Sequence, residues 1–174
     1  MTDQIIAETQ RLCIRELAAE DAEIFFQIYA DPIAMRWVDD GLPITREDSE
    51  RWLAITLNNY QGQGYGMFAI EEAGRVIGCI GITHPGGQPE AEVKYTLLRD
   101  CWGRGLASEA LAGLMAVVTD RWGLRHVIAT ADAENLASHR VLEKCGFRAR
   151  EYAEPGSEPE VLTFDWRAGE GALG

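Results

Sequence analysis

Residues 99–110 read RDCWGRGLASEA, and in this stretch a strand-like run ends, two glycines follow and a strongly amphipathic helix begins. The apolar residues of the helix recur at offsets of three and four, which places them on one buried face: Ala107, Ala110, Leu111, Leu114, Met115, Val118 and Trp122. The first N–H groups of such a helix have no partner within it. Gly103 and Gly105 allow a ligand to approach the backbone closely, so the stretch predicts a loop that binds phosphate or pyrophosphate.

Three other interpretations of the loop compete with this one. The P-loop pattern requires Gly-Lys-Ser/Thr, and the stretch has no lysine. The dinucleotide pattern requires a third glycine where Ser108 stands, and an acidic residue about 20 positions further on. The next strand, RHVIATAD, has no acidic residue before Asp132, which comes too late. A tight turn without a ligand is the third alternative, because a glycine pair alone is weak evidence.

A second motif, NLASHRVLEKCGF at residues 135–147, predicts a short helix that begins after Asn135 and ends near Gly146. Together the two segments resemble the GNAT superfamily of acetyl-CoA-dependent N-acetyltransferases, in its R/Q-G-x-G-x-G/A loop and its N-x-x-A/S…EK-x-G-F helix. The segments CWGRGLASEAL, MRWVDDGLPITREDSERWL and NLASHRVLEKCGF are similar to the RimJ/RimL branch, the ribosomal-protein N-terminal acetyltransferases. The resemblance runs from about residue 9 to residue 166. Trp102 replaces the usual Arg or Gln before the first glycine, as is typical of this branch.

The resemblance implies the GNAT acyl-CoA N-acyltransferase fold, an α/β (α+β) fold with a mixed twisted sheet of about seven strands and flanking helices. The patterns along the chain agree with the order β-α-α-β-β-β-α-β-α-β-β, with the first strand near residues 10–16 and one long helix after the glycine loop. Asp31-Pro32 is expected to end the first helix, and Thr45 to cap the second. We expect one domain over 1–174, with a core of about 9–167 and a disordered tail at 168–174.

Composition indicates a cytoplasmic enzyme. The net charge of −12 argues against a nucleic-acid partner and favours cationic substrates. The chain has no apolar run of about 18 residues and does not begin like a signal peptide, so we expect no membrane partner. The cysteines are scattered and read as reduced thiols, and the histidines do not cluster, so no metal site is expected: Cys13, Cys79, Cys101, Cys145, His84, His126 and His139.

By resemblance, acetyl-CoA enters between the strand that feeds the glycine loop and its neighbour. Backbone groups of Leu97 and Leu98 would bind the pantetheine amides. The pyrophosphate would bind along the loop, at Gly103, Arg104, Gly105, Leu106, Ala107 and Ser108. A local positive edge is needed against the acidic chain, and Arg99, Arg104, Arg140 and Lys144 lie in or beside the motifs. A solvated surface is the alternative for these charges, and is favoured for Lys144.

Two groups are candidates for the chemistry. An amine attacks a thioester only when unprotonated, and Glu92 matches a position where this branch often carries an acidic residue. The alternative is that Glu92, Lys94 and Thr96 form the solvent face of a strand. Many family members have a Tyr before the EK pair as proton donor to the leaving thiolate, but this chain has Leu142 there, which leaves the Ser138 hydroxyl.

Asn135 is expected to bond the cofactor, or to act only as a helix cap. The acceptor would bind near Trp37, Val38, His84 and Trp166, with Trp37 as an aromatic wall. It would be a primary amine, either a peptide N-terminus or a small cationic amine. A CoA-binding sensor or scaffold without turnover is the alternative function. The chain could act as a monomer or a homodimer.

Overall fold

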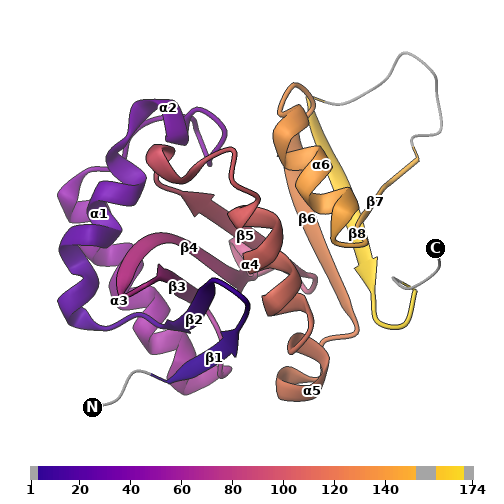
Figure 1. Cartoon of the computed structure of the whole chain (residues 1–174), viewed down its shortest axis with the longest axis horizontal. Helices are drawn as coiled ribbons and strands as arrows, with labels where there is room; N and C mark the ends of the chain where they lie inside the picture. Colours follow the sequence, from indigo (N-terminus) through magenta and orange to yellow (C-terminus); the bar gives the residue numbers. More distant parts are fainter. Residues whose placement is uncertain (1–3, 152–159, 171–174) are drawn as a thin grey trace.

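The computed structural model describes residues 4–151 and 160–170, which form an eight-stranded sheet in the order β1-β2-β3-β4-β5-β6-β8-β7 (Figure 1). The strands are β1 (Ile5–Glu8), β2 (Leu12–Glu16), β3 (Met67–Glu72), β4 (Arg75–Thr83), β5 (Ala91–Leu97), β6 (His126–Asp132), β7 (Arg148–Ala149) and β8 (Val161–Arg167). The α-helices are α1 (Ala22–Ala30), α2 (Pro32–Met35), α3 (Arg46–Gly62), α4 (Leu106–Met115), α5 (Val118–Trp122) and α6 (Leu136–Lys144). The mixed sheet with flanking helices is the architecture expected from the sequence.

The sheet has one parallel contact, between β5 and β6, and its other neighbours are antiparallel. The β5–β6 ladder contains only two paired positions, Ala91 with Val127 and Glu92 with Ile128. In Figure 1, β6, β8 and α6 lie on one side of β5, and β1 to β4 lie on the other. The short ladder therefore joins two parts of one sheet whose strands are not paired beyond Glu92.

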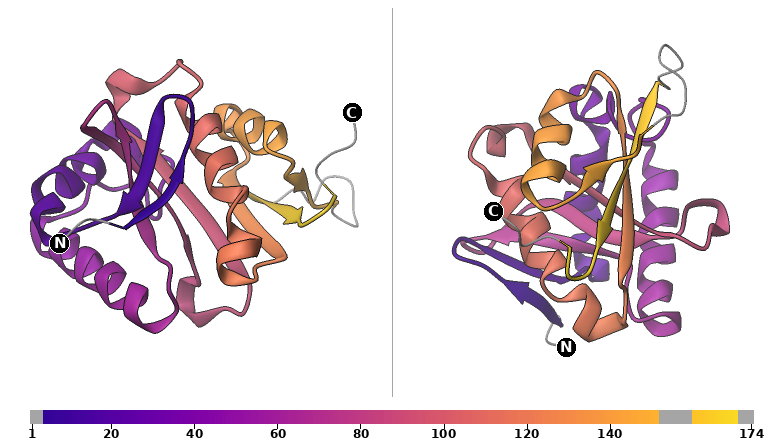
Figure 2. Two further views of the ribbon diagram at one scale, coloured as in Figure 1. Left: turned by 60° about the horizontal axis from the view of Figure 1, so that its bottom comes forward. Right: turned by 90° about the vertical axis from the view of Figure 1, so that its right-hand side faces the viewer.

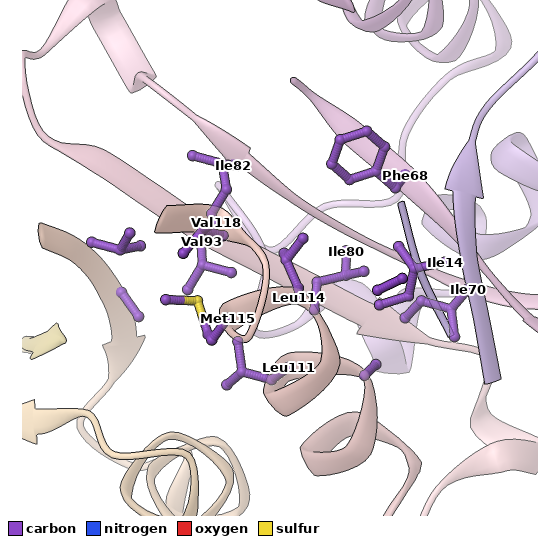
Figure 3. Packing of buried hydrophobic residues seen from close by; sticks show 14 of the residues in the cluster. Ile14, Phe68, Ile70, Ile80, Ile82, Val93, Leu111, Leu114, Met115 and Val118 are labelled. Atoms are coloured by element: carbon purple, nitrogen blue, oxygen red, sulfur yellow. The ribbon is translucent and has the colours of Figure 1, made fainter. Parts of the chain in front are cut away.

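Both faces of the central strands are buried, each by its own helices. Along β3, Phe68 and Ile70 belong to one apolar cluster, while Met67 and Ala69 belong to the other, as the period of two requires. Figure 3 shows α4 turning Leu111 toward the first cluster. The helices α1 and α3 cover the opposite face, so the sheet lies between two helical layers (Figure 2, right).

The structure differs from the sequence prediction at three elements. β1 and the four-residue α2 were not expected, and Pro32 begins α2 with Asp31 as its N-cap. The long helix is two helices, because α4 ends at Met115 and α5 begins at Val118. Val117 N–H donates to the Leu114 carbonyl at 3.0 Å, a tightened turn where β-branched residues begin.

The C-terminal part is described with a gap. The sequence predicts a strand over FRAREY (147–152), and the structure has only the two-residue β7 within the described part of this segment. Tyr152 lies outside the described residues. Of the tail expected to be disordered, 168–170 form a turn in which Ala168 N–H donates to the Arg125 carbonyl at 2.9 Å. Residues 171–174 lie outside the described part.

The described residues lack a membrane-spanning helix and a cluster of metal-ligating side chains. No helix in 4–151 or 160–170 is long and apolar enough to cross a membrane. The same residues contain no group of three or more His, Cys, Asp or Glu that could hold a metal ion. The four cysteines are free.

Candidate functional site

A cleft of about 520 Å³ opens where β5 and β6 stop pairing. One wall is β5 from Glu92 to Leu97, and the other includes Ala129, Thr130 and Ala131 of β6. The glycine loop with the first turn of α4 and the first two turns of α6 complete the walls. The unpaired ends of two parallel strands and the N-terminal turns of two helices thus line one cleft.

The glycine loop presents unsatisfied N–H groups to open space. Gly103 and Gly105 have φ of +73° and +77°, in the left-handed region that favours glycine. A Cβ on Gly103 would meet no atom within 4 Å, and one on Gly105 would meet only Arg11 Nη2 at 3.8 Å. None of the N–H groups from Gly103 to Ser108 donates to an acceptor in the described part of the chain. Six such donors at the N-terminus of α4 fit a pyrophosphate.

Two of the expected basic side chains are held by carboxylates. Arg104 makes two hydrogen bonds to Glu72, at 2.6 and 2.8 Å, and lines a smaller depression of about 370 Å³ beside the loop. Arg99 pairs with Asp31 at 2.5 Å and is not among the residues that line either hollow. The charge of each guanidinium is therefore partly neutralised within the protein.

The basic residues of α6 lie differently. Arg140 and Lys144, one turn apart, line the cleft, and Lys144 also lines the smaller depression. Both are exposed, and neither has a carboxylate within 4.0 Å in the described part of the chain. The uncompensated positive charge beside the loop therefore comes from α6, including a lysine for which the sequence favoured a solvated surface.

Glu92 is buried, with 4% of its surface exposed, although Lys94 on the same strand is exposed. Its Oε1 accepts a hydrogen bond of 2.6 Å from Thr130 Oγ1 on β6 and lies 3.4 Å from Lys94 Nζ. Its Oε2 accepts from Gln88 Nε2 at 3.3 Å. The solvent-face alternative for Glu92 is therefore wrong, and this carboxylate lies in the cleft wall within a polar network.

The loop before β5 fixes Gln88. His84 Nδ1 lies 3.0 Å from the Gln88 carbonyl, which can only accept, so this nitrogen carries the proton. The other ring nitrogen lies 2.8 Å from the Tyr65 hydroxyl. His84 thus supports Glu92 from a distance and does not itself line the cleft.

Ser138 faces Tyr95 across the cleft. The Tyr95 and Ser138 hydroxyl oxygens lie 2.7 Å apart, and both residues line the cleft. Burial raises the pKa of Tyr95 to about 12, while the hydrogen bond to Ser138 acts in the opposite direction. Nothing in the sequence singles out Tyr95, which is 43 positions from Ser138 and part of a regular strand. At the position where the family often has Tyr, Leu142 is 1% exposed.

Asn135 acts as a helix cap, since its Oδ1 accepts from Ser138 N–H at 3.2 Å, and it also lines the cleft. Its two expected roles are therefore compatible.

The backbone at the end of β5 is largely satisfied within the protein. The Leu97 carbonyl accepts from Trp102 Nε1 at 3.0 Å, and Leu97 lines the cleft. Leu98 N–H donates to the Ile77 carbonyl at 2.8 Å, and the Leu98 carbonyl accepts from Cys101 N–H at 3.0 Å. Leu98 is not part of the cleft wall.

The segment after α2 also contributes to the cleft wall. Trp37, Val38 and Asp39 line it, and the Arg36 guanidinium lies 4.5 Å from the centroid of the Trp37 ring system. Trp166, on β8, does not line the cleft. Of the four residues expected near the acceptor, the structure brings Trp37 and Val38 together there.

Comparisons with known proteins agree with this geometry. Residues 11–148 match the acetyltransferase (GNAT) domain family. The chain is 29% identical over 146 residues to an uncharacterized N-acetyltransferase, p20, of Bacillus licheniformis, with 80% of each chain covered. It is similar to the crystal structure of an acetyltransferase from Agrobacterium tumefaciens, with 28% identity, a TM-score of 0.78 and 92% of each chain covered. A RimL ribosomal L7/L12 α-N-protein acetyltransferase in complex with coenzyme A has the same fold, with 17% identity, a TM-score of 0.79 and coverage of 96% of this chain and 99% of that one.

Proposed function

This chain belongs to the acetyltransferase (GNAT) family and is an N-acetyltransferase, and we propose that it transfers acetyl from acetyl-CoA directly to a primary amine. The acceptor is a peptide N-terminus or a small cationic amine. The observation that carries this proposal is the cleft between β5 and β6, which joins a loop of free N–H donors to a buried carboxylate.

The residues present fit acetyl-CoA. The N–H groups from Gly103 to Ser108 would hold its pyrophosphate, with Arg104, Arg140 and Lys144 as nearby positive charges. Asn135 and Leu97 line the cleft and would contact the pantetheine. When bound, acetyl-CoA supplies an activated acetyl thioester.

Glu92 is the candidate group for the amine. Its carboxylate is deeply placed in the cleft wall, and Thr130 and Gln88 fix its two oxygens. A carboxylate held in this way can bind the acceptor's ammonium group and take up its proton, directly or through a water. Lys94 lies 3.4 Å from the same carboxylate, so an incoming ammonium group would compete with that side chain.

Ser138 is the candidate group for the leaving sulfur. It lies in the first turn of α6, where the Asn135 cap fixes its main chain. An alkyl hydroxyl is too weak an acid to protonate the sulfur efficiently, so the role of Ser138 would be to donate a hydrogen bond to the thiolate.

The proposed class of acceptor is supported by the charge of the chain and by its structural similarity to one protein of known description. The chain carries a net charge of −12, which favours a cationic amine, while at the cleft wall Asp39 is accompanied by the Arg36 guanidinium over Trp37. The RimL protein of the same fold acts, by its description, on the α-amino group of ribosomal L7/L12, which favours a peptide N-terminus. A panel should therefore contain both kinds of amine.

Two measurements test the proposal. Acetyl-CoA and CoA should raise the thermal midpoint, while NAD and ATP at equal concentration should not; a ligand at 100 times its Kd stabilises by about 2.7 kcal/mol. A panel of peptide N-termini and small amines is then assayed by CoA release. Binding of CoA without acetylation of any amine would favour the sensor alternative, and a larger shift with NAD would overturn the assignment of the loop.

A further inference from the structure

Tyr95 and Ser138 approach from opposite sides of the cleft and meet through their hydroxyl groups. Tyr95 comes from β5, at the position paired with Ile80 of β4, and Ser138 comes from the first turn of α6. The two oxygens lie 2.7 Å apart, while the Ser138 carbonyl lies 3.5 Å from the phenol, at the limit of a hydrogen bond. The hydroxyl-to-hydroxyl contact is therefore the strong one.

The chemistry of the two groups decides which one donates. A phenol is a stronger acid than an alkyl hydroxyl, so it is the better donor, and the serine oxygen is the better acceptor. With the phenol as donor, the Ser138 hydrogen is not used in this contact. The reverse direction would direct the Ser138 hydrogen at Tyr95 and leave none for a ligand.

We propose that Tyr95 is a positioning residue, whose phenol donates to Ser138 Oγ and so leaves the Ser138 hydrogen free to bind the thioester sulfur. This inference rests on the proposed function of the cleft. In acetyl transfer the amine nitrogen bonds to the acetyl carbon, the carbon–sulfur bond breaks with its electron pair going to sulfur, and one amine proton passes to Glu92, directly or through a water. The Ser138 hydroxyl stabilises the charge on sulfur through a hydrogen bond, and Tyr95 neither gains nor loses a proton.

The surroundings of Tyr95 keep the phenol protonated. The Tyr95 side chain packs against the main apolar cluster. Among the described residues, the ionisable side chain that acts electrostatically on the Tyr95 phenol is Cys145. Burial raises the pKa of the Cys145 thiol. Because the pKa of Tyr95 is about 12, the phenol remains a donor at pH values where a thiol has ionised.

The first test is binding and needs no acceptor. CoA and desulfo-CoA are titrated calorimetrically at pH 7 and about pH 9.5, above the value of about 8.5 for a thiol. Tyr95→Phe should weaken the binding of CoA about 5- to 10-fold at the higher pH, as expected for loss of one neutral hydrogen bond that orients the Ser138 hydroxyl. Binding of desulfo-CoA should change less than about twofold. Equal affinities of the variant and the parent for CoA at the higher pH would overturn the role of Tyr95.

The second test is turnover, with Ser138→Ala as the partner in a double-mutant cycle. Tyr95→Phe should lower kcat about 5- to 10-fold, leave the KM for acetyl-CoA unchanged, and add no further loss in the Ser138→Ala background. Independent, additive losses would overturn the proposal while leaving the acetyltransferase function intact. Failure of the parent enzyme with every amine would count against the proposed function, and the binding test still decides the role of Tyr95.

Tyr60→Phe is the matched control. The Tyr60 hydroxyl accepts from Leu17 N–H at 3.0 Å and also contacts the Met67 carbonyl, and the residue does not line the cleft. Tyr60→Phe removes the hydroxyl of a half-buried tyrosine, as Tyr95→Phe does, so it should lower stability without changing kcat per folded molecule or the affinity for CoA. A loss of kcat in this control equal to that of Tyr95→Phe would show that the effect is structural and overturn the proposal.

Discussion

Thr130 Oγ1 donates a hydrogen bond of 2.6 Å to Glu92 Oε1. Glu92 and Ile128 form the last pair of the β5–β6 ladder, and Thr130 lies two positions after Ile128 on β6. The bond fixes the carboxylate at the point where the strands cease to pair and the cleft begins. Because Glu92 Oε2 is held separately by Gln88, the carboxyl plane is constrained at both oxygens. A base held in this way needs little reorganisation when an amine arrives.

Glu92→Gln should therefore keep the affinity for acetyl-CoA and lower kcat about 100-fold or more, the usual contribution of a positioned base. Gln keeps an oxygen that can accept from Thr130, so this hydrogen bond is preserved, while the bond from Gln88 and the proton acceptor are lost. Part of the defect should be relieved as the pH rises, because more of the amine then arrives unprotonated. The measurement is a pH–rate profile of the variant and the parent.

Glu90→Gln is the control for Glu92, since Glu90 is exposed and does not line the cleft. It should match the parent at every pH. If Glu92→Gln also matched the parent across the range, a water or another group would be the base.

Gly105→Ala should raise the Kd for CoA at least about tenfold, which corresponds to about 1.4 kcal/mol. The added Cβ would lie in open space within the protein, with Arg11 Nη2 at 3.8 Å as its one near neighbour, so a loss of affinity reports on the ligand. The left-handed φ of +77° will also cost stability, about 1 kcal/mol. Calorimetric titration beside a melting curve separates the two effects.

Gly123→Ala controls for that strain. Gly123 has φ of +69°, and a Cβ there would meet no atom within 4 Å, but the residue caps α5 outside both hollows. It should lose similar stability and keep its affinity for CoA. Equal affinities for CoA in the two variants would contradict a phosphate-binding role for the loop.

Arg140→Gln and Lys144→Gln should each weaken CoA binding about two- to fivefold at low ionic strength, the range for exposed charge pairs. The difference from the parent should shrink in about 1 M salt, where screening acts over about 3 Å. Arg51→Gln, on the exposed face of α3, should bind CoA as the parent does. A double variant of α6 with the parent's affinity at low salt would show that Arg140 and Lys144 do not contribute to phosphate binding.

The parts of the site that could be predicted from sequence are those encoded locally. The Gly103 and Gly105 turn, the start of α4 and the Asn135 cap each depend on residues within a few positions, and the structure has all three features. The break after Met115 is also local, but it comes from a tightened turn with no Gly or Pro to mark it.

The side-chain partners could not be predicted, because they depend on how the sheet closes. Tyr95 and Ser138 are 43 positions apart, and Arg99 and Asp31 are 68 apart. The charge pattern around the motifs did not indicate that Arg99 would pair with a carboxylate while Lys144 would line both hollows. A basic side chain near a motif looks the same in the sequence whether it pairs with a carboxylate or faces the cleft. Only the fold determines which carboxylates lie close to it.

Asp165→Asn should destabilise the protein by roughly 2 kcal/mol near neutral pH. Hydrogen bonds from Arg150, and then from His126, lower the pKa of Asp165 to about 2, and they tie β8 to β6 and to the residue that follows β7. This folded-state value lies below the value of about 3.9 for an unfolded chain, so the stabilisation is present above pH 4 and disappears as the pH falls toward 2. The difference in unfolding free energy between parent and variant, measured in urea at pH 7, 4 and 3, should therefore be constant above pH 5 and shrink below pH 4.

Asp120→Asn, at an exposed carboxylate of α5, is the control and should show little difference from the parent at any pH. A difference for Asp165→Asn that stayed the same down to pH 3 would mean that packing, and not the ionised carboxylate, holds this edge of the sheet.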